Sequence, residues 1–283
     1  MALSFGSDPE LFLTDEQGAV IPAVGLVGGT KDKPLMVESF GMQEDNVMGE
    51  YTTPVANNSG EMVAWAMEGG RTLLRHVRAR NDRHFGIYQS PVAYFDAEVL
   101  LAAGPQAVQF GCSPDFDAYA MGAQHGRVDP RVLRFRNGAY RFAGGHVHLG
   151  YKDVTKIPEH VVAMFCDLTI GASLVWGGER QGRRRELYGM PGRYRPTSYG
   201  IEYRTPSNLW IYDARAQNAL RQGIDMLCSI LNGPVDAAQR LYNEVPWGDL
   251  KTMISDENDM AIGDFGTWLA GSYRDIGCPY AAG

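Results

Sequence analysis

The stretch FAGGHVHLG, from Phe142 to Gly150, places two histidines two positions apart behind a pair of glycines. Successive side chains of a strand point to opposite faces, so His146 and His148 share one face, and Val147 and Leu149 share the other. The pattern therefore predicts a strand with one polar face and one core face. The histidines could be a hydrogen-bonded pair or part of a ligand site. The flanking glycines favour the ligand site, because glycine lets a backbone or a ligand approach closely.

Three further segments place acids in short extended stretches. In SDPE, Asp8 and Glu10 would project from one face of the first strand, and the proline between them indicates an edge strand or a strand start. Glu50 lies in the extended, apolar stretch NVMGEYTTP, where an unpaired carboxylate is costly to bury. Glu202 and Arg204 share one face of a strand in IEYRTPSN. Taken singly, these patterns also fit a solvated strand end and a structural salt bridge.

Taken together, the four segments predict a divalent-cation site. Oxygen ligands with one or two imidazoles suit Mg²⁺ or Mn²⁺, whereas zinc sites favour closed sets of histidine and cysteine. The acidic run Glu44 to Asn46 adds oxygen donors that have no clear place in this pattern. Lys31, in the stretch VGGTKDKP, is either a phosphate contact or part of an ordinary turn.

The segment ERQGRRRELYGMPGRYRPTSYG, residues 179–200, is rich in arginine and glycine and predicts a surface loop. Guanidinium groups offer forked donors to phosphate oxygens, although some of these arginines could simply be solvated. An acid-lined cation site beside arginines is what a nucleoside triphosphate requires. Neither GxxxxGKS nor GxGxxG occurs in the chain, so ATP would be bound by another scaffold.

Composition restricts the class of protein. The chain has 283 residues, 45% hydrophobic and 21% charged, which is typical of a folded globular protein. A net charge of -7 argues against a broad electrostatic surface for nucleic acid. The four cysteines form no CxxC pair and the N-terminus has no signal-peptide pattern, so we expect reduced thiols and a cytoplasmic protein. No apolar run approaches the roughly 18 residues of a membrane span.

Hydrophobic periodicity predicts the order of the elements. Strands and turns fill the N-terminal third, and the middle, from GIYQSPVAYFD through QAVQFGCSPDFDAY to Gly150, is rich in strands. We expect helices from Asn58 or Ser59 to about Arg80, from near Pro158, over 213–233 and over 234–245, and a strand over 201–210. This order predicts one α+β domain, 1–283, with a motif-bearing core of about 6–210 and a helical part of about 211–283.

In this order, DPE, the acidic stretch ending in GE, GGHVHLG, YGMPGRYR and IEYRTPSN resemble the glutamine-synthetase-like superfamily, and most closely the phage-type carboxylate-amine ligases, or type 2 amidoligases. The resemblance runs from about Gly6 to Trp210. It implies a curved, mainly antiparallel sheet that forms a partial barrel, with helices packed on its outer face.

The resemblance also assigns roles to individual residues. It implies cation ligands at Asp8, Glu10, Glu50, His146 and Glu202, with Glu50 also counted as catalytic, and it gives His148 a phosphate-side or structural role. The implied phosphate and catalytic residues are Arg204, which faces the transferred phosphate, and Arg185, Arg193 and Arg195, with Lys31 as a further nucleotide contact. Related enzymes often carry two glutamates on the first strand, where this chain has Asp8 and Pro9.

The implied activity is ATP- and Mg²⁺- or Mn²⁺-dependent formation of an amide bond through an acyl phosphate. The partners would be a small-molecule or peptide carboxylate and an amine, and the fold often builds sites shared between subunits of a homo-oligomer. A phage-encoded enzyme would act in the host cytoplasm. Two alternatives remain: a metal-dependent hydrolase, for which His76, His84, His125 and His160 show no suitable placement, and a non-catalytic phage nucleotide-binding or structural protein.

Overall fold

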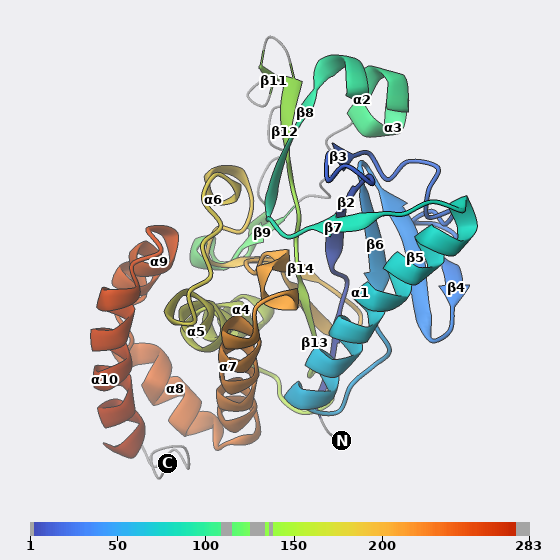
Figure 1. Cartoon of the computed structure of the whole chain (residues 1–283). Coiled ribbons are helices and arrows are strands. Elements are labelled where there is room, and N and C mark those ends of the chain that lie inside the picture. The colour runs from blue at the N-terminus through green and yellow to red at the C-terminus, as the bar shows by residue number, and fades with distance from the viewer. Residues whose placement is uncertain (1–2, 109–114, 125–133, 136–137, 276–283) are drawn as a thin grey trace.

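The computed structural model describes residues 3–108, 115–124, 134–135 and 138–275. The described part is a mixed α+β structure in which curled antiparallel sheets lie beside a group of helices (Figure 1). Cys112, His125 and Cys278 lie outside the described residues. The two described cysteines, Cys166 and Cys228, are free thiols, as expected.

Three sheets make up the β part, and every pairing between described strands is antiparallel. The first sheet has the order β1 (Ser4–Ser7), β13 (Val147–Gly150), β15 (Gly200–Tyr203), β14 (Arg193–Pro196), β9 (Phe116–Asp117) and β10 (Ala123–Gln124). The second has the order β3 (Val20–Ile21), β2 (Glu10–Thr14), β6 (Met48–Thr52), β5 (Phe40–Asp45) and β4 (Leu35–Val37), and β7 (Gly86–Tyr88) pairs with β2. The third has the order β11 (Arg134–Phe135), β12 (Gly138–Phe142) and β8 (Val92–Asp96).

Bent connections join these sheets into one curled surface. Strand β1 continues into β2 through Asp8 and Pro9, and β12 continues into β13 through residues 143–146. Backbone hydrogen bonds bridge the first bend: the Tyr51 N–H donates to the Pro9 carbonyl at 3.3 Å and the Glu10 N–H donates to the Gly144 carbonyl at 2.9 Å. The predicted fold class, a partial barrel with packed helices, is therefore confirmed.

The bend at Asp8 and Pro9 corrects one expectation. Asp8 and Glu10 do not lie on one face of a single strand, because β1 ends at Ser7 and β2 begins at Glu10 in a different sheet. Proline has no N–H for a ladder hydrogen bond, so the strand is interrupted there. The two carboxylates consequently project into two neighbouring groups of side chains.

The first helix, α1 (Ser59–Asn81), covers the second sheet. The side chain of Asn58 accepts a hydrogen bond from the Glu61 N–H and caps the helix start, as predicted. Leu73 and Val77 of α1 are fully buried in one core cluster with residues of β2, β5 and β6. This packing fixes the strands that carry the N-terminal acids.

The second predicted helix consists of two α-helical segments with a π-helical turn between them. It consists of α4 (Glu159–Cys166), the π-turn η3 (Asp167–Gly171) and α5 (Ala172–Trp176). By length and composition alone, Glu159–Trp176 could cross a membrane, but 72% of this window is buried inside the protein. Such burial is typical of a core helix.

Four further helices complete the C-terminal part: α7 (Ala214–Asn232), α8 (Val235–Glu244), α9 (Trp247–Ser255) and α10 (Asp259–Asp275). The first two match the predicted helices, and Gly233 and Pro234 separate them. Helix α7 packs against η3 at Gly223, where a Cβ would lie 2.7 Å from the Thr169 carbonyl oxygen. The main hydrophobic cluster therefore joins the first sheet to these helices.

Three local predictions are wrong. The start of QAVQFGCSPDFDAY is helical rather than extended, because residues 106–108 lie in α3 (Pro105–Val108), which follows α2 (Ala97–Ala103), whereas Phe116–Asp117 of the same stretch forms β9. The predicted strand over 201–210 ends at Tyr203, and a short 3₁₀ turn, η4 (Asn208–Ile211), follows.

The third wrong prediction is the surface loop over residues 179–200. It contains α6 (Arg184–Leu187) and β14, and Arg184, Arg185 and Arg193 are 2%, 8% and 6% exposed. Their charges are matched by carbonyl groups and by acids from other segments, which local sequence does not reveal.

Candidate active site

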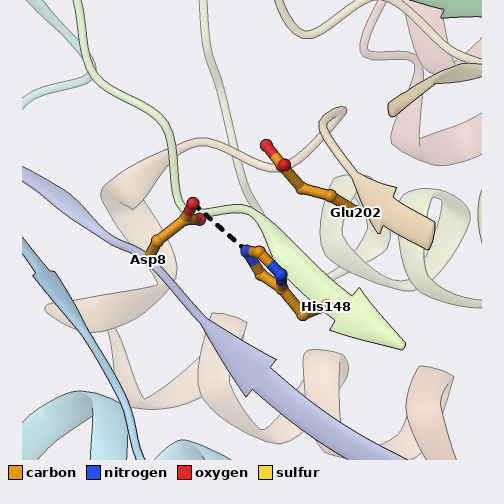
Figure 2. A group of neighbouring side chains, drawn as sticks. All are labelled: Asp8, His148 and Glu202. Carbon is orange, nitrogen blue, oxygen red and sulfur yellow. Dashed lines mark ion pairs between the residues drawn. The ribbon is translucent and has the colours of Figure 1, made fainter. Parts of the chain in front are cut away.

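Two neighbouring groups of acidic and imidazole side chains lie where the first two sheets meet. The first group combines Asp8, from the bend after β1, with His148 of β13 and Glu202 of β15 (Figure 2). His146, just before β13, lies beside them. In the antiparallel pair of β13 and β15, His148 lies directly opposite Glu202. Opposite residues place their side chains on the same face of a sheet. The strand register therefore brings these two groups together.

The distances within the first group are short. His148 Nε2 lies 3.1 Å from Asp8 Oδ2, and this ion pair is marked in Figure 2. His146 Nδ1 lies 3.3 Å from both Asp8 Oδ1 and Glu202 Oε1. One ligand atom each of Asp8, His148 and Glu202 lie within 4.8 Å of one another, a spacing that one cation can bridge.

The glycine pair before His146 serves this geometry. A Cβ at Gly144 would collide with the His146 ring, and a Cβ at Gly145 would collide with the Ser207 carbonyl and the Trp210 indole. The close approach that the sequence indicated is therefore made by the protein's own groups.

The second group is made of carboxylates alone. Glu10, Asp45 and Glu50 come from β2, β5 and β6, and one ligand oxygen of each lies within 4.8 Å of the others. Glu10 is directly opposite Glu50 in the pairing of β2 with β6. The Gly144 N–H donates to Glu10 Oε2 at 2.6 Å, and Gln43 Nε2 donates to Glu50 Oε2 at 2.8 Å. These hydrogen bonds fix the orientation of two of the three acids.

The second group accumulates negative charge in a buried place. Burial and the charge of Glu10 raise the pKa of Asp45 to about 6. Burial raises the pKa of Glu50 well above its usual range, and the charges of Asp8 and Glu10 raise it further. Because the charge of Asp8, a member of the first group, raises the pKa of Glu50, the two groups share one electrostatic environment. A divalent cation would relieve this repulsion.

The first group balances its charge internally. Burial alone would raise the pKa of Asp8, but His148 and His146 outweigh it and hold this pKa well below its ordinary value. Burial lowers the pKa of His148, but the charge and hydrogen bond of Asp8, together with the charges of Glu202 and Tyr199, outweigh burial and raise this pKa to about 10. A cation bound here would have to displace the imidazole proton first, because only a neutral imidazole is a metal ligand.

The donor set fits a hard divalent cation. Carboxylate oxygens with one or two imidazoles suit Mg²⁺ or Mn²⁺, and the described residues place no cysteine in either group. Acids at Asp8, Glu10, Glu50 and Glu202 were all expected here from the sequence. The structure brings all four into these two groups, together with both histidines.

Two of the four site arginines reach the first group. Arg195 is ion-paired with Glu202, and Arg204 Nε lies 3.2 Å from Glu202 Oε1. Arg204 also pairs with Asp115, an acid that the sequence did not single out. Glu202 itself is 1% exposed, so two cationic guanidinium groups surround a carboxylate that is screened from water.

The other two arginines are held farther away. Arg185 Nε lies 3.1 Å from Glu257 Oε1, and Arg193 Nη2 lies 3.8 Å from Asp117 Oδ2. Among the described residues neither has an ion pair with the two acid groups. Lys31 is exposed, and its charge lowers the pKa of Asp45, which places it on the side of the carboxylate group.

The sequence did not single out Asp45 as a member of the carboxylate group and could not separate it from Glu44. The β5–β6 hairpin pairs Asp45 with Met48 and turns through Asn46 at φ 54°. Alternation along β5 then points Asp45 toward Glu50, while Glu44 accepts hydrogen bonds from the N–H groups of residues 25, 27 and 28. The sequence signal that could have identified Asp45 is its position two residues after Gln43 in QED, because residues i and i+2 of a strand lie on one face.

The curled antiparallel sheets with packed helices agree with the fold that the resemblance implies. A family model described as "Phage phiEco32-like COOH.NH2 ligase-type 2" matches residues 120–227, which confirms the resemblance to this carboxylate-amine ligase family. The matched segment carries both histidines, Glu202 and the site arginines, whereas Asp8, Glu10, Asp45 and Glu50 precede it. No curated protein matches the chain.

Proposed function

We propose that this protein is an ATP-dependent carboxylate-amine ligase that forms an amide bond through an acyl phosphate at a divalent-metal site. The observation that carries the proposal is the convergence of Glu10, Asp45 and Glu50 from three strands next to the group around Glu202. The family name supports a ligase that joins a carboxyl group to an amine.

The two acid groups are the proposed cation sites. Glu10, Asp45 and Glu50 would hold one ion, and Asp8, His148 and Glu202, with His146 beside them, would hold another. Bound Mg²⁺ or Mn²⁺ would neutralise the triphosphate and the approaching carboxylate, whose like charges otherwise repel. Lys31 lies on the same side as Asp45 and would contribute a further positive charge.

The arginines would act on the transferred phosphate. Arg204 and Arg195 lie against Glu202, so their guanidinium groups border the cation site and can donate to phosphate oxygens. Arg185 and Arg193 would reach the nucleotide or the acyl phosphate from α6 and β14. Electrostatic stabilisation by such prepositioned donors is a large part of phosphoryl-transfer catalysis.

The proposed chemistry has two steps. A carboxylate oxygen of the first substrate attacks the γ-phosphorus of ATP, the bond to the leaving ADP breaks, and an acyl phosphate forms. The amine nitrogen then attacks the acyl carbon, inorganic phosphate leaves, and the amine gives up a proton to a carboxylate acting as general base. The acid and the amine are thereby joined by an amide bond, and the product is lighter than the two substrates together by one water.

An ADP-release screen tests this function. The protein is incubated with ATP and Mg²⁺ and with pools of amino acids, peptides and polyamines, and mass spectrometry searches for a product lighter by one water than its two parts. We expect ADP release that depends on Mg²⁺ and on both substrates, and no release by Glu202→Gln. Substrate cleavage with Zn²⁺ and without ATP would instead indicate a hydrolase, and tight ATP binding without turnover in any pool would indicate a binding protein.

A further inference from the structure

One contact of the first group comes from a residue that the sequence did not single out. Tyr199 lies in the turn between β14 and β15, at the end of the arginine-rich segment 179–200. Its hydroxyl oxygen lies 2.6 Å from Nδ1 of His148, which is hydrogen-bonding distance. The other ring nitrogen, Nε2, lies 3.1 Å from Asp8 Oδ2 (Figure 2). Each nitrogen of His148 therefore has its own partner.

The turn that carries Tyr199 is fixed to the end of β13. The Tyr199 carbonyl accepts hydrogen bonds from the N–H groups of Tyr151 and Lys152, at 3.0 and 3.2 Å. Lys152 Nζ also donates to the Thr197 carbonyl at 2.6 Å. The backbone of Tyr199 is thus held in place although its side chain is 46% exposed. Its hydroxyl reaches His148 from a defined position.

The contact distinguishes two orientations of the imidazole. A half-turn about the Cβ–Cγ bond exchanges Nδ1 with Cδ2 and Nε2 with Cε1, and the ring has nearly the same shape in both orientations. The turned ring would present carbon atoms to both Tyr199 and Asp8. The hydrogen bond to Tyr199 forms only in the observed orientation, so it favours the orientation in which Nε2 faces the Asp8 carboxylate.

The Nε2 atom belongs to a set of buried atoms that suit a cation. Asp8 Oδ1, His148 Nε2 and Glu202 Oε2 are buried, and in the described part of the chain none of them makes a hydrogen bond of good geometry, although each lies near an oppositely charged group. Buried polar atoms of this kind are rare in folded proteins and often mark an ion or water site. The three residues also have ligand atoms within 4.8 Å of one another. A cation between them would satisfy all three atoms.

A hydroxyl suits the Nδ1 side of such a ligand. A neutral imidazole carries its one proton on either nitrogen, and a hydroxyl can both donate and accept a hydrogen bond. When Nε2 serves as a ligand, the proton is on Nδ1, and the Tyr199 oxygen can accept it. Histidines that bind metals commonly donate their other N–H to an acceptor of this kind, which fixes the ring.

We propose that Tyr199 is a positioning residue that orients His148 so that Nε2 binds a divalent cation together with Asp8 and Glu202. The inference rests on the cation sites of the proposed function. Without the hydroxyl, the ring would be divided between its two orientations, and the affinity of the first group for the cation would fall. The group of Glu10, Asp45 and Glu50 contains no imidazole, so its affinity would be kept.

The same turn supplies a matched control. Ser198 is exposed and precedes Tyr199, so Ser198→Ala removes one hydroxyl from the turn without touching the imidazole contact. Tyr199→Phe removes only the hydroxyl and keeps the ring, whose centroid lies 6.3 Å from that of His148. His148→Ala shows how much of any nitrogen signal comes from His146.

The test measures Mn²⁺ affinity by electron paramagnetic resonance, the nitrogen modulation of the Mn²⁺ spin echo, and melting temperature. Of the two groups only the first contains imidazoles, so nitrogen modulation reports on that group. We expect Tyr199→Phe to weaken the binding of Mn²⁺ that shows nitrogen modulation by about 10- to 100-fold, the usual cost of losing an outer partner of a metal ligand. Its melting temperature should stay that of the wild type, and Ser198→Ala should match the wild type throughout. A merely structural role would instead lower the melting temperature and weaken both cation sites alike.

A double-mutant cycle completes the test. If Tyr199 acts through His148, Tyr199→Phe adds nothing to His148→Ala. The inference would be overturned by wild-type affinity and modulation in Tyr199→Phe, by an equal loss in Ser198→Ala, by additive effects in the double variant, or by a wild type without nitrogen modulation. Absence of Mg²⁺-dependent ADP release in the wild type, with the Mn²⁺ results as expected, would overturn the ligase function and leave the role of Tyr199 at the cation intact.

Discussion

At the scale of single residues, the site depends on where each acid lies relative to a bend or a hairpin. Asp8 and Glu10 are separated only by Pro9, yet Asp8 meets two imidazoles and Glu10 meets two carboxylates. Asp45 and Glu44 are adjacent, yet one faces the carboxylate group and the other holds a backbone turn. Neighbours in sequence therefore have different surroundings and different expected roles.

Neutralising single acids of the two groups should remove activity without unfolding the protein. Loss of a residue that only supports a metal ligand typically lowers metal affinity or activity by about 10- to 100-fold. Because these acids would be direct ligands, we expect Glu10→Gln, Glu50→Gln and Glu202→Gln each to lower Mg²⁺-dependent ADP release by more than this. Gln is isosteric, and burial without a cation raises the pKa of Glu50 well above its usual range, so the neutral side chain should be tolerated. Full activity in all three variants would contradict the site assignment, and far-ultraviolet circular dichroism checks the fold.

Glu44→Gln is the matched control for these variants and carries an opposite prediction. Glu44 accepts three backbone N–H groups from the turn over residues 25–28, and an amide can accept with only one oxygen. We expect a loss of stability of about 1 to 3 kcal/mol, with ADP release per folded molecule unchanged. Chemical denaturation and the same ADP assay measure the two effects.

At the scale of elements, the π-helical turn η3 connects the core helix to the strands of the site. Asp167 of this turn is fully buried and accepts hydrogen bonds from the Tyr203 and Tyr119 hydroxyls at 2.6 and 2.9 Å. Tyr203 is the neighbour of Glu202 in β15. A helix irregularity therefore supports the strand that carries a proposed cation ligand.

The pKa of Asp167 gives this element a pH-dependent signature. Burial raises this pKa from 3.8 to about 6, although hydrogen bonds from the two tyrosines oppose the rise. Because the folded protein holds the proton more tightly than the unfolded chain, stability contributed by protonated Asp167 is present below about pH 4 and is lost as the pH rises through about 6. A shift of this size corresponds to about 3 kcal/mol.

We therefore expect Asp167→Asn to weaken the fall in stability between pH 4 and pH 7 relative to the wild type. Urea unfolding at several pH values measures this difference, and comparison with the wild type removes the contribution of the other raised carboxyls, Asp45 and Glu50. An identical pH dependence in the two proteins would rule out this role for Asp167.

Helix α7 provides a second prediction at this scale. Leu220 is fully buried in the main cluster, which joins α7 to the core helix and to the first sheet. Leu220→Ala should lower the free energy of unfolding by about 2 to 5 kcal/mol, because it removes packed methyl groups and leaves a cavity. Denaturant unfolding checks this value, and a loss below about 0.5 kcal/mol, the range of surface substitutions, would show that α7 is not part of the common core.

At the scale of the whole molecule, much of the architecture was accessible from the sequence. Alternation predicted the strand of His146 and His148, and the cap at Asn58 and the stop at Gly233 predicted the bounds of two helices. The ordered motifs indicated the resemblance that the family model supports over residues 120–227, and they include the four acids other than Asp45 that lie in the two groups. These signals are local, so they do not depend on which strand pairs with which.

What could not be predicted depends on contacts between distant segments. The burial of Arg184 and Arg185 requires the carbonyls of Arg204 and Thr205, just after β15, and the carboxylate of Glu257, which no local pattern connects to them. The division of Asp8 from Glu10 depends on the pairing partners of β1 and β2. Register and tertiary pairing therefore decided the cases in which the sequence was misleading.

The most direct test of the central claim is Mn²⁺ binding by electron paramagnetic resonance, because it needs no substrate. We predict that the wild type and Glu44→Gln bind Mn²⁺ equally, and that Glu10→Gln and Glu50→Gln bind it about tenfold or more weakly. Equal binding by all four proteins would contradict the claim that carboxylates from three strands form a cation site.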